Sequence, residues 1–380
     1  MSKDIYNLIK DIYRNEKIVP LHSPYFFGNE NKIIQETIDS TFVSSIGKNV
    51  NIFEKKITKI TNSKYAVAVV NGTSALHLSL IVSNVQRNDL VITQSLSFIS
   101  TSNSIKYVGA DPVFIDIDLE TLGLSYISLK NFLENETITK NNTCYHKLSN
   151  RKIKACIPMH TFGHPVKIDK IKKICKKYNI TLIEDSAEAF GSFYKKKSVG
   201  TYGDLSILSF NGNKIITTGG GGAILTNNKI FYEKAKHLST QAKISHSWRF
   251  IHDEIGYNYR MPNINAALGI AQLENFDKII NVKRKIALKY KNHFLNTDIK
   301  FVDEPKNSVS NFWLNSILLK NKNEKEKTIK FLNDLNIKVR GCWDLIHTLK
   351  MYKDCYSYNL KNSKYIFDRL VNLPSSYIHE

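Results

Sequence analysis

The stretch SFNGNKIITTGGGG, residues 209–222, places a single lysine, Lys214, between small polar residues and four consecutive glycines. A lysine in such a place is either a solvated turn residue or a nucleophile beside a large anionic ligand. Four glycines in a row weaken a strand, and such weakness marks the close approach of a ligand or of another backbone segment. Other motifs of the chain have to decide between these two interpretations.

A carboxylate at the end of an apolar run is the second motif, TLIEDSAEAFGS, residues 181–192. Asp185 follows a predicted strand and precedes Lys214 by 29 residues. Ligands of open α/β sheets bind outside the carboxyl ends of the strands. Asp185 therefore either holds a ring nitrogen protonated, or ligates a metal, or caps the next helix.

The third motif is VVNGTSALHL, residues 69–78, where a predicted strand ends at Val70 and a helix follows. Thr73 and Ser74 open that helix. Free N–H groups and hydroxyls at a helix N-terminus bind anions. The alternative is an ordinary helix start with Thr73 as the N-cap.

Together, the three motifs fit pyridoxal 5'-phosphate (PLP). Its phosphate needs a helix N-terminus with hydroxyls, its pyridine nitrogen needs an acidic partner, and its aldehyde needs a lysine for a Schiff base. An aromatic side chain is also expected against the ring, and Phe98 in SLSFIST is well placed for that contact.

The elements that must position these residues alternate between short apolar runs and helical runs from about residue 60 to 235. Strands that alternate with helices, and that are apolar throughout, predict an α/β fold with a mostly parallel sheet covered on both faces. The polar, Asn-rich segment 134–151 is predicted to be an exposed loop. The predicted strands are KYAVAVV, DLVIT, DPVFIDID, KIKACIPMH, ITLIEDSA, GDLSILSF and GGAILTN.

The alternation of strand-like and helical segments ends at about residue 245. A long helical pattern, INAALGIAQLENFDKIINVKRKIALKYKNHFL, leads into FWLNSILL and a further helical segment. We expect a large domain over residues 1–250, with an N-terminal extension over 1–25. A smaller C-terminal α+β domain is expected over 251–380.

Several stretches resemble the DegT/DnrJ/EryC1/StrS sugar aminotransferases, which are fold-type I PLP enzymes. The resemblance is carried by YAVAVVNGTSALHLSL, IEDSAEAFGS, SFNGNKIITTGGGG and HDEIGYNYRMPNINAALGIAQLE. VPLHSPYFFGNE, IDSTFVSSIGK, CWDLIHTLKMYKDC and NLPSS are more similar to the nucleotide-sugar 4-aminotransferases of legionaminic acid and bacillosamine-type pathways.

This resemblance implies roles for the central residues. Lys214 matches the Schiff-base lysine, Asp185 the partner of the pyridine nitrogen, and Glu188 a polar residue near the phenolic oxygen of the cofactor. Family members that dehydrate sugars carry histidine at the lysine position, so Lys214 excludes that activity.

The remaining cofactor contacts are implied in the same way. Thr73, Ser74 and Ser209 match the phosphate site. Phe98 matches the aromatic position over the ring. Asn258 matches an asparagine that reaches the phosphate from the neighbouring subunit, which implies a homodimer with shared active sites.

Four further residues are candidates for substrate contacts, each with a structural alternative. His160 in PMHTFGHP either touches the sugar or is a satisfied structural histidine. Arg260 either binds an anion or orients the asparagine loop, and the loop role is favoured. Trp343 and His347 line the nucleotide-sugar pocket by resemblance, or pack between helices.

The expected reaction is amination of a nucleotide-linked 4-keto-6-deoxyhexose, carried by UDP or GDP, with L-glutamate as donor. The favoured substrate is a 2-acetamido sugar; GDP-perosamine-type and 3-amino sugar aminotransferases are the alternatives. The motifs decide neither the nucleotide nor the axial or equatorial product. A PLP-fold regulatory protein and a cysteine desulfurase, with Cys342 or Cys355 as its nucleophile, are rival interpretations.

Composition limits the remaining classes. The net charge of +20 is attributed to a Lys- and Asn-rich background with a preference for anionic ligands, since no nucleic-acid recognition signature accompanies it. Five cysteines without metal-clip spacing predict free thiols and no metal site. No apolar run approaches the length of a membrane helix, and the polar, charged N-terminal residues do not resemble a secretory signal, so a cytoplasmic location and no membrane partner are expected.

Overall fold

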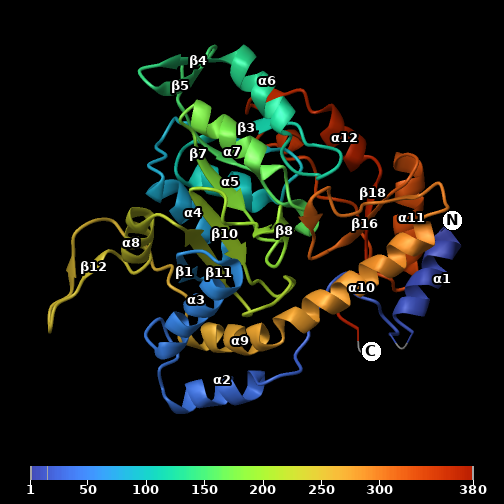
Figure 1. Ribbon diagram of the computed structural model, residues 1–380, viewed down its shortest axis with the longest axis horizontal. Helices are drawn as coiled ribbons and strands as arrows, with labels where there is room; N and C mark the ends of the chain where they lie inside the picture. The colour runs from blue at the N-terminus through green and yellow to red at the C-terminus, as the bar shows by residue number, and fades with distance from the viewer. Residues whose placement is uncertain (1, 15, 379–380) are drawn as a thin grey trace.

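An eight-stranded sheet runs through the centre of the computed structural model, which describes residues 2–14 and 16–378 (Figure 1). Its strand order is β1-β11-β10-β7-β6-β2-β3-β17. Only β11 runs antiparallel to its neighbours, so the predicted mostly parallel sheet is confirmed. The strands are β1 (Tyr65–Val69), β2 (Leu90–Gln94), β3 (Asp111–Ile115), β6 (Ile153–Ile157), β7 (Thr181–Asp185), β10 (Leu205–Ser209), β11 (Gly222–Thr226) and β17 (Ser357–Tyr358).

Both faces of this sheet are buried, which explains why its strands are apolar at successive positions. In β1, Val67 and Val69 pack into one core with α4, α5 and α8, whereas Ala66 and Ala68 pack into another with α3 and α9. Helices α6 and α7 cover the far end of that second face. These helices are α3 (Lys48–Thr61), α4 (Gly72–Val82), α5 (Ile99–Tyr107), α6 (Tyr126–Glu136), α7 (Ile168–Lys177), α8 (Lys229–Leu238) and α9 (Asn263–Glu274).

The C-terminal part has a separate core around a three-stranded antiparallel sheet of order β14-β16-β18. The long helical pattern of this region is broken at Asn275 into α9 and α10. Helix α1 joins the C-terminal core through Ile5, Ile9 and Ile12, although it lies at the opposite end of the sequence (Figure 1). The elements are α1 (Ser2–Ile12), α10 (Phe276–Phe294), β14 (Lys300–Phe301), β16 (Asn315–Leu318), α11 (Lys322–Asp334), α12 (Lys361–Phe367) and β18 (Leu370–Leu373).

Shorter elements complete the structure. Helix α2 packs on α9, β15 pairs with β8, and β12 and β13 form an arm that projects from the body (Figure 1). Helix α9 falls within the predicted C-terminal domain, yet it packs on α3 of the predicted large domain. The domain boundary at residue 250 therefore stays a prediction. These elements are α2 (Glu30–Asp39), β8 (Phe193–Tyr194), β9 (Lys197–Ser198), β12 (Lys243–Ile244), β13 (Ile251–His252) and β15 (Ser308–Val309).

Residues 137–146 within the segment 134–151 form a β-hairpin, so the predicted loop is wrong, whereas much of the segment is exposed as expected. Strands β4 (Thr137–Lys140) and β5 (Thr143–His146) pair antiparallel. Asn141 and Asn142 connect them with φ of +47° and +58°. Two central residues with positive φ form the turn that matches strand twist, and asparagine accepts that conformation well.

Within the described residues, no helix is both long and apolar enough to cross a membrane.

Candidate active site

Five strands of the central sheet end at one cavity. The strands β1, β2, β6, β7 and β10 point in the same direction, and residues at their ends or just after them line a cavity of about 310 Å³. This is the carboxyl edge of the parallel strands, where ligands of such sheets bind. A volume of this size lies within the range of small-molecule sites.

Asp185, the last residue of β7, is a buried polar group of the cavity. The Thr101 hydroxyl, in the first turn of α5, donates to Asp185 Oδ2 at 2.8 Å, and the Ala187 N–H donates to Oδ1 at 3.2 Å. Burial raises the pKa of Asp185, while these donors and the charge of Lys214 oppose the rise. A cationic ring nitrogen beside this buried group would favour its ionised, carboxylate form.

Lys214 and Glu188 face each other across the cavity. Lys214 Nζ donates to Glu188 Oε1 at 3.3 Å, and the Phe162 N–H donates to Glu188 Oε2 at 2.9 Å. The Lys214 side chain is 13% exposed, because it lies in the loop between β10 and β11 and not on an outer surface. The solvated-turn interpretation of Lys214 therefore does not hold.

The turn between β1 and α4 brings polar groups to the other end of the cavity. Asn71 is the N-cap of α4 and accepts from the Ser74 N–H at 2.7 Å, so Thr73 is not the cap. The Thr73 hydroxyl donates to Ser100 Oγ at 3.0 Å and lines the cavity. Ser74 is buried and lies outside the lining.

Ser209 completes this end of the cavity from the last position of β10. A Cβ on Gly72 would lie 3.3 Å from Ser209 Oγ, so the hydroxyl lies against the first turn of α4. Free N–H groups of such a turn, with nearby hydroxyls, are suited to binding an anion, so the phosphate site stays a prediction.

The glycine run following Lys214 packs against protein and not against the cavity. A Cβ on Gly222 would lie 2.6 Å from the Asn71 carbonyl carbon, and one on Gly221 would lie 2.0 Å from Thr218 Oγ1. Gly219 has a φ of +76°, a conformation that favours glycine. The glycines thus let β11 pack closely beside the β1–α4 turn.

Phe98 and Trp343 both line the cavity, with ring centroids 6.2 Å apart. Phe98 sits at the start of α5, and Trp343 lies in the segment between α11 and β17. The structure thus brings six predicted cofactor residues together with one of the four predicted substrate contacts: Lys214, Asp185, Glu188, Thr73, Phe98, Ser209 and Trp343.

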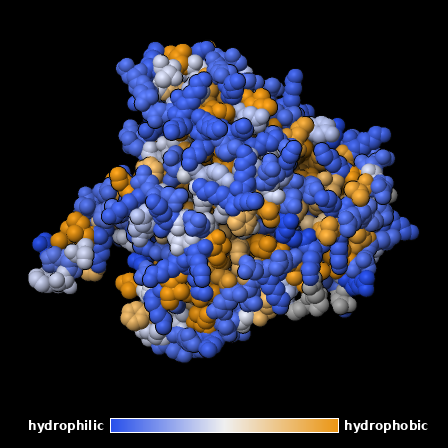
Figure 2. Space-filling model, in the orientation of Figure 1, coloured by the Kyte–Doolittle hydropathy of each residue, from blue (hydrophilic) through white to orange (hydrophobic). Residues whose placement is uncertain are grey.

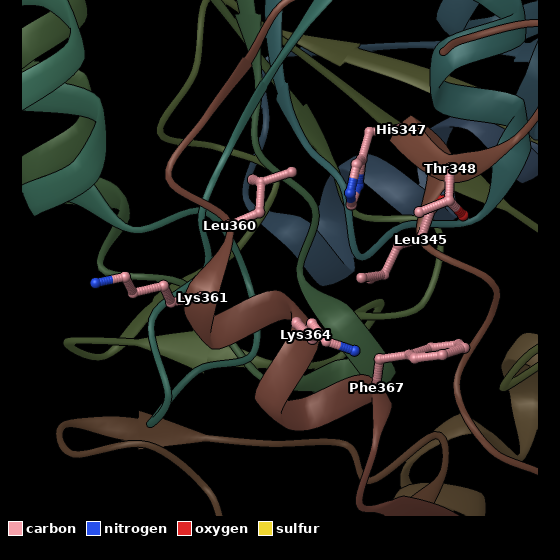
Figure 3. A pocket seen from close by; sticks show the side chains of 7 residues that line it. All are labelled: Leu345, His347, Thr348, Leu360, Lys361, Lys364 and Phe367. Carbon is pink, nitrogen blue, oxygen red and sulfur yellow. The ribbon is translucent and has the colours of Figure 1, made fainter.

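His160 and His347 lie outside this lining. His160 Nε2 bonds to Glu184 at 3.1 Å and its Nδ1 accepts from the Val166 N–H, so the geometry favours the structural alternative for His160. His347 Nδ1 lies 2.7 Å from Ser95 Oγ, and its ring lines a separate pocket between Leu345 and α12 (Figure 3).

Arg260 and Asn258 also lie outside the lining. Arg260 pairs with Val69 at the end of β1 through its backbone, and Asn258 pairs with Thr240. Asn258 is exposed, and its contact across a subunit interface stays a prediction.

Sequence reasoning missed several lining residues. Thr101 has a local signal, because it lies in the same helical turn as Phe98, and Asn71 has the N-cap preference of asparagine. Trp313 and Arg340 come from the C-terminal lobe and carry no local signal. The others are Gly72, Leu76, Ser100, Met159, Ala187, Ile207, Asn211 and Asn213.

These residues fit PLP. The cavity offers a buried acid for a ring nitrogen, an amine for an aldehyde, a helix start with hydroxyls for a phosphate, and aromatic side chains beside a planar ring.

The cysteine desulfurase interpretation needs a reactive thiol in the cavity. Cys342 and Cys355 are free but do not line it. Burial raises the pKa of Cys342 to about 12, which leaves the thiol protonated at neutral pH. The structure does not support that interpretation.

Comparison with known proteins agrees with the geometry. Residues 27–378 match the model of the DegT/DnrJ/EryC1/StrS aminotransferase family. GDP-perosamine synthase of Escherichia coli O157:H7 is 39% identical over 94% of this chain and 93% of its own. Helicobacter pylori PseC, an aminotransferase of pseudoaminic acid biosynthesis, superposes with a TM-score of 0.84 at 25% identity, over 94% of both chains. Spr1654 of Streptococcus pneumoniae, solved in its PLP form, shares the fold with a TM-score of 0.84 at 23% identity, over 94% of this chain and 93% of its own.

The fold and the site thus define a fold-type I aminotransferase, and the chain belongs to the DegT/DnrJ/EryC1/StrS aminotransferase family. It is a sugar aminotransferase, and its cofactor is PLP.

Proposed function

We propose that this aminotransferase converts a GDP-linked 4-keto-6-deoxyhexose to its 4-amino sugar, with L-glutamate as the amino donor. The observation that carries the nucleotide and the sugar is the 39% identity to GDP-perosamine synthase of Escherichia coli O157:H7 over almost the whole chain. The perosamine-type alternative therefore replaces the 2-acetamido sugar as the favoured substrate.

PLP, when bound, supplies an electron-withdrawing ring that stabilises negative charge on the carbon next to the transferred nitrogen. Asp185 is the group that holds positive charge at the ring nitrogen, since it is a buried acid with two hydrogen-bond donors. Lys214 is the group that takes and returns the proton, because its amine enters the cavity on a flexible stem. Glu188, hydrogen-bonded to that amine, orients it.

A homodimer is part of the proposal. The arm of β12 and β13 carries Trp248 and Phe250, and Ile255 follows it; all three side chains are largely exposed. Phe42 and Ile46, between α2 and α3, add exposed apolar surface. Figure 2 shows hydrophobic residues on the projecting arm and on the lower part of the same face. Clustered apolar side chains on a projecting arm are typical of a subunit interface.

The test is a substrate panel with GDP- and UDP-linked 4-keto-6-deoxy sugars, including a UDP-linked 2-acetamido sugar, and L-glutamate, with each product assigned by NMR. We expect turnover of the GDP-linked sugar and little of the UDP-linked ones. Faster turnover of the 2-acetamido sugar would overturn the proposed substrate and leave the aminotransferase class intact.

Lys214→Ala is the matching variant. We expect it to lose turnover by at least about 10³-fold, because one amine serves both covalent and acid–base roles. Lys229→Ala, which removes an exposed surface lysine, is the control and should retain activity. Near-normal turnover by Lys214→Ala would contradict the assigned role.

A further inference from the structure

Trp313 approaches Lys214 from the other lobe of the molecule. It lies in the loop between β15 and β16, 99 residues further along the chain, and only 2% of it is exposed. Lys214 Nζ lies 4.2 Å from the centre of the indole ring. The indole Nε1 donates to the Asn213 carbonyl at 2.6 Å, so the tryptophan also holds the backbone next to the lysine.

The loop carrying Trp313 is fixed to the active-site segment by Asn311. Its side-chain Nδ2 donates to the backbone carbonyls of Glu188 and Phe190, each at 2.9 Å. The Asn311 side-chain oxygen accepts from the Trp313 N–H at 2.8 Å. The positions of Trp313 and Glu188 are therefore coupled through one asparagine.

Lys283 of α10 supports the same loop from the core of the C-terminal lobe. Its buried amine donates to the Trp313 carbonyl at 3.1 Å and to the Ser375 carbonyl. The ring of His22 lies 6.4 Å from that of Trp313. Burial, with the charges of Lys283 and Lys214, lowers the pKa of His22, so this ring is neutral beside the indole.

We propose that Trp313 is a positioning residue for the Lys214 amine, which it holds as an ammonium group between the indole face and the Glu188 carboxylate. A cation over an indole face is stabilised relative to a neutral amine. The indole and the Glu188 carboxylate thereby keep the amine in place whenever it is not bonded elsewhere. This inference rests on the proposed function, in which Lys214 is the reacting amine.

The test measures how fast trinitrobenzenesulfonate labels Lys214 in the full-length, cofactor-free protein, with the labelled peptide identified by mass spectrometry. Only the neutral amine reacts. We expect Trp313→Leu to label about fivefold faster than wild type near pH 7.5, from loss of the cation–indole contact. The advantage should vanish near about pH 11, where lysine amines are mostly neutral.

Two variants and one internal reporter make the result specific. Trp313→Phe keeps a weaker aromatic face and should show a smaller acceleration. Trp343 lines the same cavity, but its ring packs against Phe98 and Phe162, so Trp343→Leu should label like wild type. Buried Lys283 should stay protected in every variant, because it reports local unfolding.

Equal labelling of Trp313→Leu and wild type would overturn the proposal. So would an acceleration of the same size at both pH values, or one that Lys283 shares, because either result shows altered access or looser packing. The labelling needs neither cofactor nor substrate, so a failure of the proposed substrate appears only in the sugar panel.

Discussion

Glu188 carries a carboxyl group for which burial and a neighbouring ammonium group act in opposite directions. Burial raises its pKa from 4.5 to about 7, although the Lys214 charge and the Phe162 N–H favour the ionised form. The group thus changes charge near neutral pH, next to the amine of Lys214.

A stability measurement can detect this pKa. Since the folded-state pKa lies above the unfolded one, the folded protein binds more protons between pH 4.5 and about 7, and its stability falls as pH rises through that window. Relative to Glu188→Gln, the cofactor-free wild type should lose about 3 kcal/mol of unfolding free energy across it. Urea denaturation at several pH values measures the difference.

Glu304→Gln is the control with the opposite sign. Burial raises the pKa of Glu304, but hydrogen bonds from Arg284 and Ser310 outweigh burial and lower it. Wild type should therefore gain stability over this variant as pH rises through the carboxyl range. If wild type and Glu188→Gln keep a constant stability difference at every pH, the carboxyl of Glu188 titrates normally.

At the scale of elements, the site depends on how closely β11 approaches the turn between β1 and α4. A Cβ at Gly222 would lie 2.6 Å from backbone atoms of Asn71, which cannot rotate away as a side chain can. The first turn of α4, with its predicted anion site, would have to move.

We therefore expect Gly222→Ala to cost about 1–3 kcal/mol of stability through overpacking, and to weaken PLP binding. Gly212→Ala is the matched control, because nothing lies within 4 Å of its added Cβ, and it should change stability by less than about 0.5 kcal/mol. Chemical denaturation and a cofactor titration measure both effects. Equal stability and equal PLP affinity of the two variants would show that the contact between β11 and the β1–α4 turn adjusts to an added methyl group without cost.

The arrangement of the elements also explains which parts of the site could be predicted from the sequence. Asp185 and Ser209 end apolar strands, and a turn with a helix start follows β1, so these parts of the site have local signals. Trp313 and Arg340 enter the cavity only because the C-terminal lobe packs against the sheet, and no periodicity encodes that contact. The β4–β5 hairpin was predictable from its Asn-Asn turn, but its Asn-rich composition favoured a loop.

At the scale of the whole molecule, substitutions in the exposed arm of β12 and β13 test the proposed homodimer. Replacing Trp248, Phe250 and Ile255 together by serine should convert a dimer to a monomer at micromolar concentration, because the proposed interface loses its apolar side chains. Light scattering after size-exclusion chromatography gives the mass.

Leu148→Ser removes an equally exposed apolar side chain just beyond the β4–β5 hairpin and should leave the mass unchanged. A triple-serine variant that keeps the wild-type mass would place the interface elsewhere. If the cavity is shared between subunits, as Asn258 predicts, the monomer should also bind PLP more weakly.

Helix α1 has its partners in α10 and α11, and the Ser375 N–H donates to the Leu21 carbonyl at 2.7 Å. During synthesis on the ribosome, the first helix therefore emerges some 270 residues before α10 and waits with Ile5 and Ile9 unburied. The nascent chain therefore exposes this apolar face until α10 and α11 have been synthesised, and the C-terminal core is complete only once β18 has followed.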